Sequence, residues 1–231
     1  MERRMAEDFL WFSYFGITKS DAESDKNCAL NACIQRAYLD LCRTIRYKNN
    51  TQSIEKGIRD KNPNMICYSK KKKDFICSIN NSIHSAINGE LLIGKKLSSE
   101  EFERWHYDLC NTITEADHNS EVLKDDSHLQ YGQAQKWINM SVKYMLVMGL
   151  WDEYLDVNLD LFHVPLDSLV FSAAKISLGI DNKYDSWSRL QEQDYKDYQQ
   201  KIREKVECPI KWEWDAWIEQ AKREKKEPTN D

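Results

Sequence analysis

A lysine and an aspartate stand at corresponding places in the sequence, each near the start of an apolar segment. Lys136 lies near the beginning of the most apolar helical pattern, at about 132–149, and Asp167 lies in the turn 164–168 that leads into the next one. A lysine amine in its neutral form can attack an electrophilic carbon and form a Schiff base. A neighbouring aspartate could take up its proton or stabilise positive charge on a sugar ring. The two residues therefore suggest nucleophilic chemistry, provided that the fold brings them together.

Each of these residues also has a purely structural explanation. A lysine at such a position is commonly solvated or half buried, and an aspartate directly before a helix is a standard N-terminal cap. Lys136, Asn139 and Lys143 are spaced i, i+3 and i+7, so they share one face of the expected helix. That face begins at a helix N-terminus, where backbone N–H groups favour an anion. The structural and the chemical explanations both stay open until the distance between Lys136 and Asp167 is known.

Composition and charge narrow the class of protein. The chain has 231 residues, of which 41% are hydrophobic and 31% charged, with only four prolines and seven glycines. These values are typical of a globular, helix-rich protein and not of a disordered one. The net charge of −5 counts against a generic nucleic-acid binder, although a local basic patch can dominate the field at a groove. We therefore expect an all-α fold.

The sequence gives no indication of a membrane segment, a metal site or a cofactor. No run of 18 apolar residues occurs, and the N-terminus is a poor signal peptide. The seven cysteines form no CxxC pair and no Cys/His cluster with zinc spacing. We interpret them as reduced core thiols. The expectation is a cytoplasmic protein with no membrane partner and no cofactor.

Apolar periodicity predicts helices along most of the chain. They are expected at about 3–16, 27–47, 68–89, 98–113, 132–149, 169–178, 191–206 and 212–222. Ser98 and Glu101 have the spacing of a capping box at the start of one of them. The segments between the helices are polar or acidic: 48–64, 114–128 with short helical potential at 120–124, 151–163 and 180–190.

These helices are expected to form one compact unit over residues 1–222. The sequence leaves open whether this unit divides into two lobes, about 1–128 and 129–222, with a cleft between them. Residues 223–231 are expected to be a charged tail.

Three short motifs resemble the helix-hairpin-helix superfamily of DNA glycosylases. Residues 132–136 (GQAQK) are similar to the end of its hairpin and the lysine that follows, and residues 163–168 (HVPLDS) to the turn that carries its essential aspartate. Residues 209–217 are similar to the C-terminal part of some members. The connection between lysine and aspartate is most similar to that of the archaeal 8-oxoguanine glycosylase branch. The hairpin itself is degenerate, since residues 129–132 contain one glycine and no proline, and no cysteines suited to an iron–sulfur cluster follow.

The resemblance implies an enzyme that flips a modified nucleotide out of double-stranded DNA and excises its base. Lys136 would attack C1′ and expel the base, and Asp167 would activate Lys136 or a water and stabilise the oxocarbenium-like transition state. Elimination of the 3′ phosphate could follow. The implied substrate-binding residues are Gln135, Trp137, His163, Trp214, Asp215 and Trp217. The implied DNA contacts are Gly132, Gln133 and Lys143, together with the lysine run Lys70, Lys71, Lys72 and Lys73.

Several alternatives stay open at this level. The lysine run 70–73, expected at a helix start, is either a solvated face or a phosphate contact, and each tryptophan is either a stacking wall or part of the core. The enzyme, expected to be a monomer, could act in DNA repair or on modified bases of invading (phage) DNA. The competing interpretation is a non-enzymatic α-helical protein-interaction domain, in which Lys136 is solvated and Asp167 is only a cap.

Overall fold

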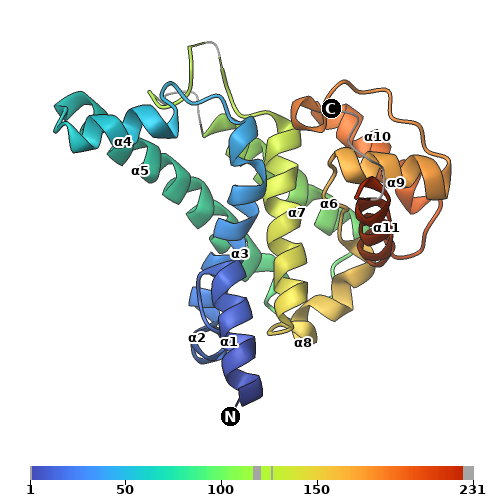
Figure 1. The fold of residues 1–231 in the computed structure, drawn as a ribbon. Coiled ribbons are helices and arrows are strands. Elements are labelled where there is room, and N and C mark those ends of the chain that lie inside the picture. The colour runs from blue at the N-terminus through green and yellow to red at the C-terminus, as the bar shows by residue number, and fades with distance from the viewer. Residues whose placement is uncertain (1, 117–120, 126, 226–231) are drawn as a thin grey trace.

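The chain folds into an all-α structure, shown by a computed structural model in Figure 1. The structure describes residues 2–116, 121–125 and 127–225. Within these ranges the only β-type pairing is an isolated antiparallel bridge between Tyr47 and Leu123, so the predicted fold class is confirmed. The degenerate helix-hairpin-helix element stays a prediction. In the same ranges, no helix combines the length and the apolar character needed to cross a bilayer.

The described residues form a series of helices along the chain. In order they are α1 (Glu2–Phe15), α2 (Lys19–Ser24), α3 (Lys26–Leu41), η1 (Cys42–Thr44), α4 (Thr51–Arg59), α5 (Pro63–Ala86), η2 (Ile87–Leu91), α6 (Ser99–Glu115), α7 (Tyr131–Met148), α8 (Asp152–Leu155), η3 (Asp156–Leu161), α9 (Ser168–Leu178), η4 (Trp187–Arg189), α10 (Glu192–Arg203) and α11 (Pro209–Glu224).

Helix α7 occupies the middle of the molecule (Figure 1). All residues from 131 to 142 are buried, as expected for a helix that is apolar on nearly every side. It packs along α3, where the fully buried Trp137 donates from Nε1 to the Ile34 oxygen at 3.2 Å and lies 5.0 Å from the Tyr38 ring. Gly149 then ends the helix in the left-handed conformation, with φ of 66°. The apolar pattern therefore places α7, and Lys136 with it, inside the core.

The remaining helices lie on two sides of α7. In Figure 1, α4 and α5 project to one side, and α9, α10 and α11 lie on the other. One continuous hydrophobic core includes residues before and after position 128, and the long α3–α7 contact joins these two parts of the chain. Helix α11 continues to Glu224, so the expected tail begins later than residue 223. Positions 226–231 of that tail lie outside the described residues.

Capping contacts at the helix starts can be compared with the elements expected from the sequence. The predicted capping box is present, since Ser98 Oγ accepts from the Glu101 N–H at 3.1 Å and the Glu101 carboxylate accepts from the Ser98 N–H at 2.8 Å. Helix α4 lies in the segment 48–64, for which no helix was predicted. It is capped by Asn50, which accepts from the Ser53 N–H at 2.8 Å, and it buries little besides Ile54. Its nine residues contain only two large apolar side chains, Ile54 and Ile58, spaced i and i+4, so the pattern is too short to predict a helix by itself.

Helix α5 begins at Pro63, five residues before the expected start at 68. Asn62 caps it by accepting from the Asn64 N–H at 3.0 Å, and proline is favoured in the first helical turn. The lysine run 70–73 therefore lies inside the helix and not at its start, which corrects the expectation of four lysines at a helix N-terminus. The segment 121–125 is not helical, and Leu123 pairs with Tyr47 instead. Residue 120 of that expected helix lies outside the described residues.

Candidate active site

A cavity of about 810 Å³ opens between α1, α3, α7, α9, α11 and η4. This volume lies in the range of small-molecule sites in proteins. The lining side chains come from both halves of the chain: Tyr14, Arg36, Leu39, Asp40, Cys42, Arg43, Lys136, Met140, Lys143, Tyr144, Val147, Asp167, Ser168, Leu169, Trp187, Glu213, Trp214, Trp217 and Ile218.

Lys136 and Asp167 meet in this cavity. Lys136 Nζ lies 2.7 Å from Asp167 Oδ2 and 3.4 Å from the Pro165 oxygen. Only 6% of the lysine side chain and 17% of the aspartate side chain are exposed. Asp167 also caps α9, because its Oδ1 accepts from the Val170 N–H at 2.8 Å. One carboxylate oxygen therefore serves the helix and the other serves the amine.

Two buried glutamines hold the 164–168 turn in place beside α7. Gln135 Nε2 donates to the Leu166 oxygen at 3.1 Å, and Gln135 Oε1 accepts from the Leu166 N–H at 3.3 Å. Gln199 of α10 makes the same paired contact with Val164, at 2.6 Å and 3.2 Å. The two side-chain amides satisfy the backbone groups of an extended segment that is buried away from water. Because Gln135 directly precedes Lys136, the contacts that fix the turn also fix Asp167 relative to the amine.

A buried polar network holds the side chain of Gln135 in place. Asn139 Nδ2 donates to Gln135 Oε1 at 3.1 Å and to the Tyr195 hydroxyl at 2.9 Å. Asn139 Oδ1 lies 2.8 Å from His106 Nε2, which acts as the donor. Burial holds the pKa of His106 well below its ordinary value, so the imidazole is neutral. Asn139 thus stabilises the turn and does not face the cavity.

His163, expected among the substrate-binding residues, belongs to this network and does not line the cavity. Its Nδ1 lies 2.8 Å from the Tyr195 hydroxyl, and its Nε2 lies 3.0 Å from Glu103 Oε1. The side chain is fully buried, and burial lowers the pKa of His163. Its position next to the aspartate turn in sequence reflects a structural role, which corrects the expectation.

A second lysine–carboxylate pair lines the cavity and includes a residue that the sequence did not indicate. Lys143 Nζ lies 2.8 Å and 2.7 Å from the two carboxylate oxygens of Glu213, which is 1% exposed. Burial raises the pKa of Glu213, although Lys143 acts in the opposite direction. Glu213 lies three residues after Ile210 and four before Trp217, so it occupies the inward face of α11. The sequence signal that could have identified Glu213 is a carboxylate on the otherwise apolar face of this helix.

Aromatic rings lie above the two lysines. Lys136 Nζ is 5.9 Å from the Trp187 ring centroid, and Lys143 Nζ is 5.6 Å from that of Trp217. Trp214 also lines the cavity. Two of the expected substrate-binding residues, Trp214 and Trp217, thus line the cavity, and Trp187 comes from a segment expected to be a loop.

The α1–α3 wall carries a further polar group that sequence reasoning missed. Arg36 and Asp40 form an ion pair at 3.0 Å, and the Tyr144 hydroxyl donates to Asp40. The hydroxyls of Tyr14 and Tyr144 are 3.0 Å apart, and the Arg36 guanidinium lies 4.4 Å from the Tyr14 ring centroid. Helix α1 therefore completes the cavity from the opposite end of the chain.

The expected hairpin contacts to DNA are not available at the start of α7. The Gly132 N–H donates to the Leu190 oxygen at 3.0 Å, and a Cβ at this glycine would overlap the Trp187 backbone oxygen. Gln133 is buried, and its Nε2 donates to the Thr44 oxygen at 2.9 Å. Gly132 and Gln133 therefore hold segments of the chain together, which corrects their assignment as phosphate contacts.

Three more expected substrate-binding residues lie elsewhere. Gln135 and Trp137 are fully buried in the contacts described above. Asp215 is exposed and lines a neighbouring surface groove between α9 and α11. The apolar pattern of α7 and α11 marks the helices correctly but does not indicate which residues face a cavity.

The lysine run 70–73 does not line the cavity. Lys71 pairs with Glu121, and Lys72 lies 3.8 Å from the Tyr47 ring centroid, where burial lowers its pKa. Lys70 and Lys73 are exposed. The run therefore combines a solvated face with local structural contacts on α5.

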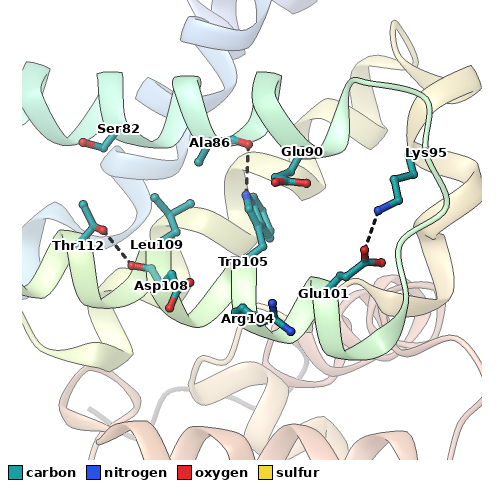
Figure 2. Close-up of a pocket in the computed structure, with 10 residues that line it drawn as sticks. All are labelled: Ser82, Ala86, Glu90, Lys95, Glu101, Arg104, Trp105, Asp108, Leu109 and Thr112. Atoms are coloured by element: carbon teal, nitrogen blue, oxygen red, sulfur yellow. Dashed lines mark hydrogen bonds and ion pairs between the residues drawn. The ribbon is translucent and has the colours of Figure 1, made fainter.

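A hollow of about 510 Å³ between α5 and α6 differs chemically from the cavity (Figure 2). Trp105 Nε1 donates to the Ala86 oxygen at 3.2 Å, and Lys95 lies 2.6 Å from Glu101 at its edge. These contacts connect neighbouring elements, and the Lys95–Glu101 pair is open to solvent on both sides. This hollow therefore does not combine a buried amine with a carboxylate, as the cavity does.

No protein-family model, curated protein or solved structure matches this chain. Among residues 2–116, 121–125 and 127–225, no group of three or more His, Cys, Asp or Glu side chains could hold a metal ion. The cysteines in those ranges are free thiols. Function is therefore inferred from the chemistry of the cavity.

Proposed function

We propose that this protein is a DNA glycosylase that excises a modified base from double-stranded DNA. The observation that carries the proposal is the 2.7 Å contact between Lys136 Nζ and Asp167 Oδ2 inside a cavity of about 810 Å³. An enzyme that acts on a base must take it out of the helical stack into such a pocket. The similarity of residues 132–136 and 163–168 to the lysine and aspartate motifs of helix-hairpin-helix glycosylases supports the same assignment.

The proposed reaction begins with transfer of a proton from Lys136 to Asp167. The neutral amine attacks C1′ of the extruded nucleotide, the C1′–N bond breaks, and the departing base keeps the electron pair and gains a proton. Asp167 supplies that proton to the base and, again a carboxylate, stabilises positive charge on the sugar. Transfer of the proton of the newly bonded amine to O4′ opens the sugar ring and leaves an imine between Lys136 and C1′. Loss of a C2′ proton then breaks the C3′–O bond and releases the 3′ phosphate.

A water molecule activated by Asp167 gives the alternative outcome, in which the product is an abasic site and the strand stays intact. The distance between Lys136 and Asp167 is compatible with either route, since a general base acts within hydrogen-bond reach.

The other cavity residues suit an extruded base. Trp214 and Trp217 offer apolar faces on which a base can stack. Lys143 and Glu213 offer an N–H donor and a carboxylate acceptor side by side, so a base edge with complementary groups can replace part of their mutual contact.

The alternative of a non-enzymatic interaction domain requires a solvated lysine and an aspartate that only caps. Lys136 is 5% exposed and its amine contacts Asp167 directly. Taking a lysine and a carboxylate out of water costs free energy, which their mutual contact offsets only when its geometry is good. The contact therefore favours the enzymatic interpretation.

The experiment is a substrate screen with wild type, Lys136→Gln and Lys175→Gln. Lys175 is a suitable control because it lies on α9 and is 69% exposed in its side chain. Duplexes carrying oxidised, deaminated, alkylated or hypermodified bases are incubated with each protein, and abasic sites and strand breaks are measured. We expect product from wild type and Lys175→Gln and none from Lys136→Gln. Absence of product on every duplex would refute the proposal, and the substrate class that reacts separates repair from action on phage DNA.

A further inference from the structure

The start of α7 is closed to DNA, so a glycosylase of this structure must hold the duplex elsewhere. The Gly132 N–H is used by the Leu190 oxygen, and the η4 segment covers the glycine so closely that a Cβ would not fit. A phosphate cannot reach backbone N–H groups that are already bonded and covered. The charges around the cavity indicate where the contact lies instead.

Four cationic side chains line the cavity, and three of them are neutralised by a carboxylate that also lines it. These pairs are Arg36–Asp40, Lys136–Asp167 and Lys143–Glu213. The fourth cation is Arg43 of η1, which is exposed and has no carboxylate within 4.0 Å in the described part of the chain. Arg43 is thus the free positive charge at the cavity mouth among these four, although the whole protein has a net charge of −5. An unpaired guanidinium in such a place suits a phosphate oxygen.

An exposed apolar side chain lies about one helical turn before Arg43 in the sequence. Leu39 precedes it by four residues at the end of α3, lines the same cavity and is 52% exposed. Val147 and Ile218, which are 54% and 46% exposed, lie on other parts of the lining. Proteins that distort DNA insert such apolar side chains between base steps. Arg43 therefore suits the negatively charged backbone of a duplex, and Leu39 suits its apolar base stack.

We infer that the edge formed by Leu39 and Arg43 docks on double-stranded DNA next to the extruded nucleotide. Arg43 contacts a backbone phosphate, and Leu39 occupies space in the base stack. The inference rests on the proposed function and adds the place where the duplex binds. It also replaces the buried hairpin and the lysine run 70–73 as the main contact to DNA.

Equilibrium binding at several salt concentrations tests the role of Arg43. The probe is a fluorescent duplex with a tetrahydrofuran abasic-site analogue, which the protein can bind but cannot process. Neutralising one phosphate contact lowers the slope of log K against log salt by about 0.9. We expect this change for Arg43→Gln and no change for Arg59→Gln, a control on α4 that is also exposed and has no carboxylate within 4.0 Å in the described residues. Equal slopes for wild type and Arg43→Gln would overturn the inference.

Base unstacking tests the role of Leu39. A 2-aminopurine placed next to the abasic-site analogue becomes brighter when a side chain disturbs the stack. We expect Leu39→Ala to lose at least half of this increase while keeping the wild-type salt slope, and Ile58→Ala on α4 to behave as wild type. Ile58 is a matched control because it is 45% exposed and is not among the residues that line the cavity. An unchanged signal in Leu39→Ala would remove Leu39 from the contact.

The tests distinguish failure of the docking edge from failure of the proposed function. If wild type excises a base, and Arg43→Gln and Leu39→Ala bind and unstack the duplex as wild type does, only the docking edge is overturned. Wild type that neither binds the duplex nor forms product overturns both.

Discussion

Asp167 makes two contacts that substitution can separate. Its Oδ1 caps α9 by accepting from the Val170 N–H at 2.8 Å, and its Oδ2 lies 2.7 Å from Lys136 Nζ. Asparagine caps helices about as well as aspartate but carries no charge, and alanine does neither. Asp167→Asn therefore removes the charge partner of Lys136 and keeps the cap, whereas Asp167→Ala removes both.

The contacts set the expected loss of stability. Removing one partner of a buried ion pair costs about 3–5 kcal/mol, because the other charge stays buried without compensation. The Asp167 side chain is 17% exposed, and the asparagine oxygen still accepts a hydrogen bond from Lys136, so we expect about 2 kcal/mol for Asp167→Asn. Loss of the cap adds about 1 kcal/mol, which gives about 3 kcal/mol for Asp167→Ala. For a chain of this size, 2 kcal/mol lowers Tm by roughly 4–8 °C.

Urea unfolding followed by circular dichroism measures both variants. Asp25→Asn is the matched control, because Asp25 caps α3 and has no cation within 4.0 Å in the described residues. We expect the control to stay within about 0.5 kcal/mol of wild type. If Asp167→Asn behaves like the control and Asp167→Ala loses only about 1 kcal/mol, Asp167 is a cap and nothing more. That result would refute the assignment of a coupled amine and carboxylate.

Three further outcomes follow from other contacts. Gly132→Ala should lower the unfolding free energy by about 1–3 kcal/mol, because a Cβ overlaps the η4 backbone; wild-type stability in urea would contradict this packing. Burial lowers the pKa of His106 and His163, so the folded state binds fewer protons than the unfolded state, and stability is full above about pH 6.5 and falls below it. The urea midpoint should therefore drop between pH 7 and 5.5, and it should drop less steeply in His106→Gln. A urea midpoint that does not change with pH would contradict neutral imidazoles. Glu213→Gln should lower the ratio of kcat/KM between preferred and other modified bases roughly tenfold or more, because it removes the carboxylate of the Lys143–Glu213 pair. Borohydride should still trap this variant on an abasic-site duplex. An unchanged ratio would show that the Lys143–Glu213 pair does not recognise the base.

The fold class could be predicted from the sequence because its main signal is strong. Helix α7 is apolar on nearly every side, and such a helix must be buried. The lysine and aspartate motifs marked the two residues that meet in the cavity. Their distance could not be predicted, because it depends on Gln199 of α10, whose side chain holds the 164–168 turn from a remote part of the chain.

Residues that depend on tertiary packing were predicted less well. Trp137 is apolar and near Lys136 in sequence, yet it faces α3 and not the cavity, and periodicity alone cannot separate these two faces of a buried helix. Glu213 was missed because it stands between Trp212 and Trp214, and the sequence does not show that the glutamate is buried more deeply than these two tryptophans. His163 was assigned to substrate because of its place in a motif, although the network with Tyr195 and Glu103 uses both of its nitrogens.

Identification of the covalent adduct tests the central claim most directly. Wild type and Lys136→Gln are incubated with a reactive duplex and sodium borohydride, which reduces an imine to a stable amine, and the modified peptide is located by mass spectrometry. The account predicts a sugar adduct on Lys136 in wild type and no adduct in the variant. An adduct on another lysine, or neither adduct nor abasic sites on any duplex, would contradict it.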